Sequence, residues 1–243
     1  LVCFYKEHMQ RLSNSLNYLN IKVEDDFFEM IRNFAKELIE NNKIQTGRMR
    51  LTVSPGVWTL PEFRSEKITF VLSASPISNN PKPIKLMTSG YKKPIEAFLP
   101  PFVKVTGNFP SILSYKEARS KNFDEAIMLR SDDIVTEGSF CNLFWIDKSG
   151  IMKTPSLKSC ILDGVTRTQI LESAKSINIK IQEGEYSKAE LHTCKSLFIS
   201  SATRGLLQAV QLDDRIFEKS KSNDILAIIK EYENRESDSL KKF

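Results

Sequence analysis

Two side chains in the middle of the sequence have the right chemistry to act on a bound aromatic aldehyde: the amine of Lys104 and the carboxylate of Glu137. A lysine amine forms a Schiff base with an aldehyde most readily when partial removal from water lowers the pKa of the amine. A carboxylate that faces a pyridinium nitrogen keeps that nitrogen protonated, so the ring can accept electrons from a carbanion. The stretch from Lys104 to Asn142 is therefore the part of the chain that indicates a chemistry.

Each of these residues also has an ordinary structural interpretation. Lys104 lies between a Pro-Pro pair and a glycine-containing turn, and a lysine at the end of a strand is usually a surface charge. Glu137 could be a turn residue before the strand FCNLFWI. Asn142, on that strand, could orient the carboxylate or satisfy backbone groups. Position alone leaves both interpretations open.

Three further segments could bind a phosphate. Arg11 lies in EHMQRL on a predicted helix, and arginine matches phosphate geometry, although a helical arginine is usually only solvated. The segment ILDGVTR leads into a helix, where Gly164 and Thr166 could present N–H groups and a hydroxyl to an anion, or could form an ordinary N-cap. The turn SSATRG follows a predicted strand and could bind the same phosphate.

Hydrophobic periodicity gives the elements that must position these residues. Helices are predicted over residues 7–19, 23–40, 111–121, 162–178 (with a loop at its start) and 225–233, and strands over 49–53, 67–74, 83–90, 125–129, 140–147, 149–155 and 196–202. The proline-rich segment SPISNNPKP is the best candidate linker. We therefore predict an α/β (α+β) fold with a small N-terminal α+β domain, residues 1–78, and a larger α/β domain, residues 79–243.

Charge and cysteine content narrow the possible functions. The net charge is +5, from 35 basic and 30 acidic residues, and no basic run exceeds two residues, which disfavours nucleic-acid binding and suits an anionic small molecule. The four cysteines form no C-x-x-C pair, so neither a structural zinc nor a disulfide framework is expected. No apolar stretch approaches membrane-spanning length, and the first residues do not read as a signal peptide. We expect a cytoplasmic protein with no metal and no membrane partner.

The order and spacing of the five motifs resemble one known family. EHMQRL, KVTGNFP, VTEGSFCNLFWI, ILDGVTR and SSATRG together are similar to the class IV (fold-type IV) aminotransferases, which use pyridoxal 5'-phosphate. That family includes branched-chain aminotransferases, D-amino acid aminotransferases and 4-amino-4-deoxychorismate lyases. The resemblance implies a two-domain enzyme of amino acid metabolism with the cofactor in the cleft between its domains, and a homodimer.

The resemblance also implies roles for individual residues. Lys104 would form the Schiff base with the cofactor, and Glu137, helped by Asn142, would hold the pyridine nitrogen. The cofactor phosphate would be bound by Arg11, by the helix entry at Gly164, Val165 and Thr166, and by the turn of Ser201, Ala202 and Thr203. Independently of the resemblance, Arg48 and Arg50 could meet a substrate carboxylate, although exposed strand arginines are the safer interpretation.

Three functions follow from these features. The first is transfer of an amino group between an amino acid and a 2-oxo acid. The alternative is the lyase reaction, which releases pyruvate and 4-aminobenzoate from aminodeoxychorismate for folate synthesis and uses the same lysine. The third is a non-catalytic relative that serves as a binding module. It is motivated by Phe109, where several relatives carry a tyrosine, and by the absence from this sequence of the strand that precedes EHMQRL in the family. Ala202, where others carry a hydroxyl, is a further departure from the family pattern.

Overall fold

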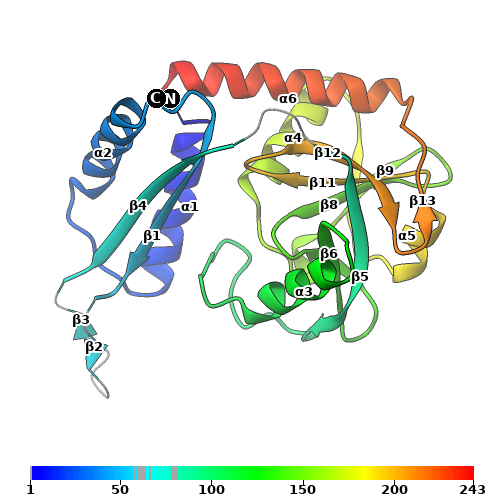
Figure 1. Ribbon diagram of the computed structural model, residues 1–243, viewed down its shortest axis with the longest axis horizontal. Coiled ribbons are helices and arrows are strands. Elements are labelled where there is room, and N and C mark those ends of the chain that lie inside the picture. Colours follow the sequence, from blue (N-terminus) through cyan, green and yellow to red (C-terminus); the bar gives the residue numbers. More distant parts are fainter. Residues whose placement is uncertain (1, 57, 60–63, 66, 78–81) are drawn as a thin grey trace. The chain divides into compact units, whose positions relative to one another are not determined.

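The computed structural model describes residues 2–56, 58–59, 64–65, 67–77 and 82–243 (Figure 1). The chain forms two compact units, one of residues 1–81 with 239–243 and one of residues 82–238. The boundary predicted between residues 78 and 79 falls outside the described residues, so the division into domains at that point stays a prediction. Each unit is described by itself below.

The first unit contains the two helices and the strand pair that the sequence predicts. Its elements are α1 (Tyr5–Tyr18), α2 (Phe27–Asn41), β1 (Gly47–Ser54), β2 (Trp58–Thr59), β3 (Arg64–Ser65) and β4 (Thr69–Pro76). β1 and β4 pair antiparallel over their whole length, and β2 pairs with β3. The core of the unit is Leu16 of α1 against Phe27 and Ile31 of α2, which lie one helical turn apart on the same face.

Helix α2 begins four residues later than predicted. The amide of Phe27 donates to the carbonyl of Glu24 at 3.0 Å, so residues before Phe27 form a turn, and Asp26 takes the N-cap position. The apolar Val23, which suggested an earlier start, packs against the same core from this turn. Hydrophobic spacing alone could not separate a core contact in a turn from one in a helix.

The second unit is built on a nine-stranded mixed sheet. Its strand order is β10-β9-β8-β11-β12-β5-β6-β7, with β13 paired to β12. The strands are β5 (Ile84–Lys93), β6 (Glu125–Arg130), β7 (Val135–Gly138), β8 (Asn142–Ile146), β9 (Met152–Pro155), β10 (Ile181–Gly184), β11 (Ser196–Ser201), β12 (Gly205–Leu212) and β13 (Arg215–Ile216). The helices are α3 (Phe109–Ser120), η1 (Leu157–Ser159), α4 (Val165–Ser176), α5 (Lys188–Thr193) and α6 (Asn223–Lys241), whose last residues group with the first unit. Helix α3 lies beside β5 and β6 (Figure 1).

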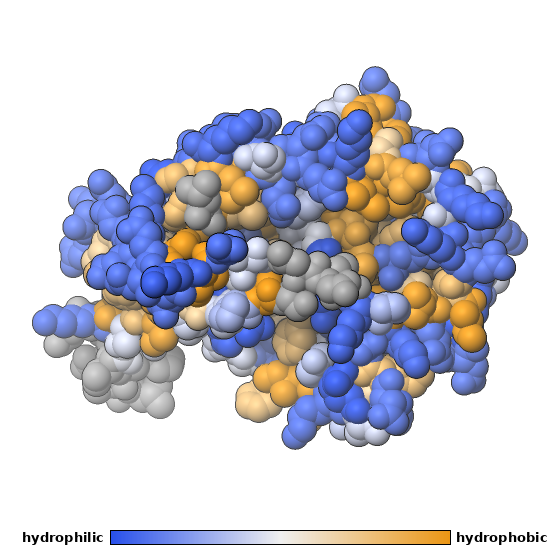
Figure 2. All heavy atoms as spheres, turned by 45° about the horizontal axis from the view of Figure 1, so that its top comes forward, coloured by the Kyte–Doolittle hydropathy of each residue, from blue (hydrophilic) through white to orange (hydrophobic). Residues whose placement is uncertain are grey.

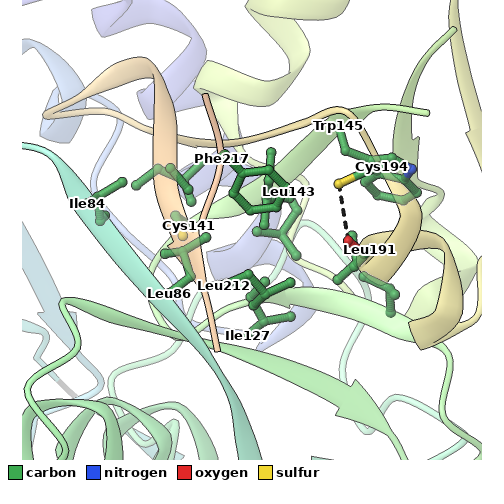
Figure 3. Close-up of a cluster of buried hydrophobic side chains, with 14 of the residues drawn as sticks. Ile84, Leu86, Ile127, Cys141, Leu143, Trp145, Leu191, Cys194, Leu212 and Phe217 are labelled. Atoms are coloured by element: carbon green, nitrogen blue, oxygen red, sulfur yellow. Dashed lines mark hydrogen bonds between the residues drawn. The ribbon is translucent and has the colours of Figure 1, made fainter. Parts of the chain in front are cut away.

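One face of this sheet carries the main hydrophobic core (Figure 3). Leu143 and Trp145 of β8 lie in this core, together with Leu197 and Ile199 of the neighbouring strand β11. Because side chains alternate along a strand, the residues between them point to the opposite face. On the outside, hydrophilic residues cover most of the face shown in Figure 2, with apolar residues in smaller groups between them.

The opposite face carries polar residues near the start of α4. Asn142 of β8 pairs across the ladder with Ser200 of β11, and both side chains lie on the face away from the main core. Helix α4 contacts β11. The alternation of the two strands therefore separates an apolar core from a polar group that belongs to the candidate site.

Glu137 lies within a strand and not in a turn before one. It is part of β7, which pairs antiparallel with β6. The turn comes one residue later, where the amide of Gly138 donates to the carbonyl of Cys141 at 2.8 Å. A β-carbon at residue 138 would collide with the Cys141 sulfur, so glycine is needed for this close approach.

A buried carboxylate fixes the same turn from the other side. Glu125, the first residue of β6, is 2% exposed, and its Oε1 accepts the amide hydrogens of Ala126 and Ser139, each at 3.0 Å. Burial raises the pKa of Glu125 above its ordinary value, while the two amides and the positive charge of Arg204 oppose that rise.

Several elements differ from the prediction in length or were missed. β5 continues three residues beyond the predicted end at Gly90, and α6 begins two residues before the predicted helix 225–233 and ends eight residues after it. β10, β12 and α5 were not predicted. β10 (IQEG) and α5 (KAELHT) are too short to show a period, and β10 forms because it pairs in parallel with β9. Within the described ranges, no helix has the length and apolar character needed to cross a membrane.

Replacing Gly138 by alanine should destabilise the protein by about 1–3 kcal/mol, because the new methyl group has no room beside the buried Cys141 thiol. Urea unfolding measures the change. Gly107→Ala is the matched control, since a β-carbon there would meet nothing within 4 Å. Equal stability of the two variants would contradict the packing described for this turn.

Because of Glu125, the free energy of unfolding should fall as the pH rises. Its pKa is raised in the folded state, so between the ordinary value of 4.5 and the raised value the folded protein holds a proton that the unfolded chain releases. The free energy of unfolding therefore falls as pH increases through this window. Urea unfolding between pH 4.5 and 8 should show a smaller fall for Glu125→Gln than for the wild type. The exposed Glu172→Gln is the control and should follow the wild type.

Candidate functional site

The carboxylate of Glu137 is buried and accepts three hydrogen bonds. Its Oε1 accepts a hydrogen bond from the ammonium of Lys93 at 2.5 Å. Its Oε2 accepts the amide hydrogen of Leu162 at 2.9 Å and the side-chain amide of Asn142 at 3.3 Å. Three donors on one buried carboxylate hold it in one orientation.

The loop between η1 and α4 is tied to this carboxylate and to the chain that follows β5. Asn142 uses its second amide hydrogen to reach the carbonyl of Leu162 at 2.9 Å. The ammonium of Lys93 also donates to the carbonyl of Cys160 at 2.9 Å. At the end of the loop, the amide of Asp163 donates to the carbonyl of Pro101 at 2.7 Å. The loop thus joins segments that are far apart in the sequence around Glu137.

The start of α4 is open to an anion. Gly164 is its N-cap residue and provides no side-chain cap, and the first N–H groups of a helix have no partner within the helix. A β-carbon at residue 164 would collide with Oδ1 of Asn142, so this residue must be glycine for the helix to start against β8. Val165 and Thr166 form the first turn and are buried. The amides and the helix dipole here favour a negatively charged ligand.

Two buried hydroxyls beside the same group lack a partner. Ser139 Oγ, two residues after Glu137, and Ser200 Oγ, across the ladder from Asn142, make no hydrogen bond within the part of the chain that the structure describes. Leaving a buried hydroxyl unpaired costs about 1–3 kcal/mol, so such groups indicate a place for water or for a polar ligand. The Glu137 carboxylate is suited to a cationic group of a ligand. The N–H groups at the start of α4 are suited to an anionic group of the same ligand.

Lys104 lies in the connection between β5 and α3 and is exposed. It follows Pro101 by three residues, and Pro101 is bonded to the 160–164 loop. Since three residues span at most about 11 Å, the Lys104 backbone lies in the neighbourhood of that loop. Formation of a Schiff base is favoured by an amine partly removed from water, whereas Lys104 is exposed in this structure.

The remaining predicted residues are dispersed. Ser201 ends β11, and Ala202 and Thr203 form the exposed turn that follows it. Arg11 on α1 and the exposed pair Arg48 and Arg50 on β1 belong to the first unit. The role of Arg11 rests on the resemblance, and the substrate roles of Arg48 and Arg50 stay predictions.

Lys93 is the residue of the site that sequence reasoning missed. It is the second lysine of a KK pair, and such pairs are usually surface charges. The predicted strand ended at Gly90, whereas β5 continues to Lys93 and brings its side chain over β6 to Glu137 on β7. Lys93 could have been placed near Glu137 only if the strand had been predicted to continue beyond Gly90.

The buried Cys141 thiol near the site is not a candidate nucleophile. Burial raises the pKa of the Cys141 thiol well above its ordinary value, and the negative charge of Glu125 adds to that rise, so this thiol stays protonated. Among the described residues, no three or more His, Cys, Asp or Glu side chains are grouped in a way that could hold a metal ion.

Comparison with known proteins gives one family. A family model described as amino-transferase class IV matches residues 2–212. A Methanocaldococcus jannaschii protein assigned as a branched-chain-amino-acid aminotransferase is 28% identical over 236 residues, which cover 95% of this chain and 81% of that protein.

Solved structures share the fold. A Legionella pneumophila protein assigned as a 4-amino-4-deoxychorismate lyase superposes with a TM-score of 0.86 at 23% identity, covering 96% of this chain and 86% of that one. The branched-chain aminotransferase of Thermoproteus uzoniensis, solved with norvaline, gives a TM-score of 0.84 at 22% identity, covering 98% of this chain and 82% of that one. These likenesses confirm the predicted fold-type IV architecture.

The family match extends over most of the sequence and includes all five motifs that carry the resemblance. The chain belongs to the class IV aminotransferases, a family of enzymes that depend on pyridoxal 5'-phosphate.

Proposed function

We propose that the chain binds pyridoxal 5'-phosphate and transfers an amino group between an amino acid and a 2-oxo acid. The observation that carries the proposal is the buried carboxylate of Glu137, fixed by Leu162 and Asn142 in a chain of this family. A carboxylate in that state is suited to holding a protonated pyridine nitrogen.

The residues of the second unit fit the cofactor at both of its ends. Glu137 would hold the ring nitrogen. The uncapped start of α4, with the amides of Val165 and Thr166, would hold the phosphate, together with the turn of Ser201, Ala202 and Thr203. Arg11, of the first unit, is proposed as a further phosphate ligand on the family resemblance alone. The unpaired hydroxyls of Ser139 and Ser200 also support a polar ligand at this place. When bound, the cofactor would supply an electron sink for the carbon that loses its proton.

Lys104 is the residue that we assign to the covalent link. The aldehyde and the ring nitrogen are on opposite sides of the pyridine ring, so the reactive amine cannot lie at the carboxylate. The ammonium of Lys93 is hydrogen-bonded to the carboxylate of Glu137, so Lys93 lies at the end that would hold the ring nitrogen and not at the aldehyde end. Lys104 belongs to a segment held against the 160–164 loop. Once a substrate amine replaces it, Lys104 would move a proton from and to the substrate carbon.

The relatives suggest the substrate and the setting. Because curated relatives of this chain are named as branched-chain aminotransferases, we propose a branched-chain amino acid as the amino donor. Arg48 and Arg50 remain candidates for binding its carboxylate. A homodimer and a cytoplasmic location, which the family resemblance and the cysteine content predict, belong to the same proposal.

The lyase reaction is the alternative. It uses the same lysine, and the Legionella pneumophila structure shares the fold with this chain at too low an identity to indicate a substrate. A non-catalytic relative is the third possibility, and it would take up no cofactor. Absorbance and activity measurements separate the three.

Lys104→Ala should abolish the visible absorbance band that pyridoxal 5'-phosphate gives when it is bonded to a lysine, and should lower activity about 10²–10⁴-fold through loss of proton transfer. Lys116→Ala, on the exposed side of α3, is the matched control and should keep both. A visible band that survives in Lys104→Ala would refute the assignment of this lysine.

The purified enzyme should convert leucine, isoleucine or valine with 2-oxoglutarate to the matching 2-oxo acid and glutamate, because the relatives with these names share most of its length. Aminodeoxychorismate should release no pyruvate above the rate without enzyme. Pyruvate and 4-aminobenzoate formed at the higher rate would establish the lyase instead. A colourless protein that takes up no added cofactor would support the binding module.

A further inference from the structure

An ion pair almost closed off from water lies at the carboxylate that the proposed function gives to the cofactor. The side chains of Lys93 and Glu137 are 13% and 10% exposed, and Nζ lies 2.5 Å from Oε1. The adjacent Lys92 also forms an ion pair, with Asp133, but those side chains are 43% and 64% exposed. The two neighbouring lysines thus provide a buried pair and a surface pair for comparison.

The buried ammonium bonds to two groups of this site. Besides Oε1 of Glu137, Nζ of Lys93 donates to the carbonyl of Cys160 at 2.9 Å. A charge taken out of water is costly unless it is paired and hydrogen-bonded, so the pair depends on both acceptors. Removing either member leaves the other charge buried with fewer partners.

The carboxylate has little room for another cation. Oε2 already accepts two hydrogen bonds, from Leu162 and Asn142, and Oε1 accepts one from Lys93. Each carboxylate oxygen has about two acceptor positions, so one position remains, next to the ammonium. A protonated ring nitrogen placed there would lie beside a like charge, which disfavours both cations.

We infer that Lys93 is a positioning residue that holds Glu137 when no cofactor is bound and competes with the cofactor for the same oxygen. The inference rests on the proposed function. Lys93 is the last residue of β5, and its four-carbon stem is flexible, so the ammonium can withdraw from Oε1 without moving the sheet. Glu137 then exchanges one cationic partner for another and is never left buried without one.

A purely structural role for Lys93 predicts the opposite result. If Lys93 only supports the fold of the site, its loss weakens cofactor binding. If Lys93 competes, its loss strengthens binding although the protein without cofactor becomes less stable. The sign of the change in affinity therefore decides between the two roles.

The affinity experiment uses pyridoxamine 5'-phosphate, which has no aldehyde and so reports the ring and phosphate contacts without a bond to lysine. Fluorescence titration of the cofactor-free protein should give a dissociation constant for Lys93→Met roughly tenfold lower than for the wild type, as expected if the pair keeps about nine in ten molecules closed. Lys93→Arg, which keeps the charge, and Lys92→Met, which removes the exposed neighbour, should both stay within about twofold of the wild type. Equal or weaker binding by Lys93→Met overturns the inference.

The pair itself is tested without any cofactor by a double-mutant cycle of Lys93→Met and Glu137→Gln in urea unfolding. The double variant should be more stable than the sum of the two single losses predicts. Additive losses would overturn the inference and leave the proposed function standing. Failure of the wild type to bind either pyridoxamine or pyridoxal 5'-phosphate would overturn the proposed function, and the competition with it.

Discussion

The second unit of this protein is organised around a negative charge that has been removed from water. A buried carboxylate is costly unless donors surround it, and the chain supplies these from three places: a strand end at Lys93, a loop amide at Leu162 and a strand side chain at Asn142. The arrangement explains why the 160–164 loop has a defined position although it has no regular structure of its own. The loop loses conformational freedom because its Leu162 amide donates a hydrogen bond to Glu137.

Close packing also accounts for the two glycines beside the site. Gly138 lets β7 turn tightly against Cys141, and Gly164 lets α4 begin against Asn142. A β-carbon at residue 164 would displace Asn142, which donates to the carboxylate, and one at residue 138 would displace the buried Cys141 side chain. The hydroxyls of Ser139 and Ser200, buried without partners among the described residues, are the part of this arrangement that the protein chain alone does not satisfy.

The sequence predicted most of this framework and part of the site. The two helices and strand pair of the first unit, the strands that contain EAIML and NLFWI, and the family itself follow from periodicity and motif order, because each depends on local pattern. Lys93 did not follow, since its partner is 44 residues away and lies across an intervening strand. β10 likewise depends on pairing with β9 and has no pattern of its own. Charge pairs and short strands that depend on distant segments produce no periodic pattern in the sequence.

Asn142 links three parts of the second unit through one side chain. Its amide nitrogen grips Glu137 and the loop at Leu162, while its amide oxygen lies against Gly164 at the start of α4. One rigid planar group therefore spans the gap between the carboxylate and the helix amides. A change at this single side chain would therefore disturb the carboxylate, the loop and the start of the helix together.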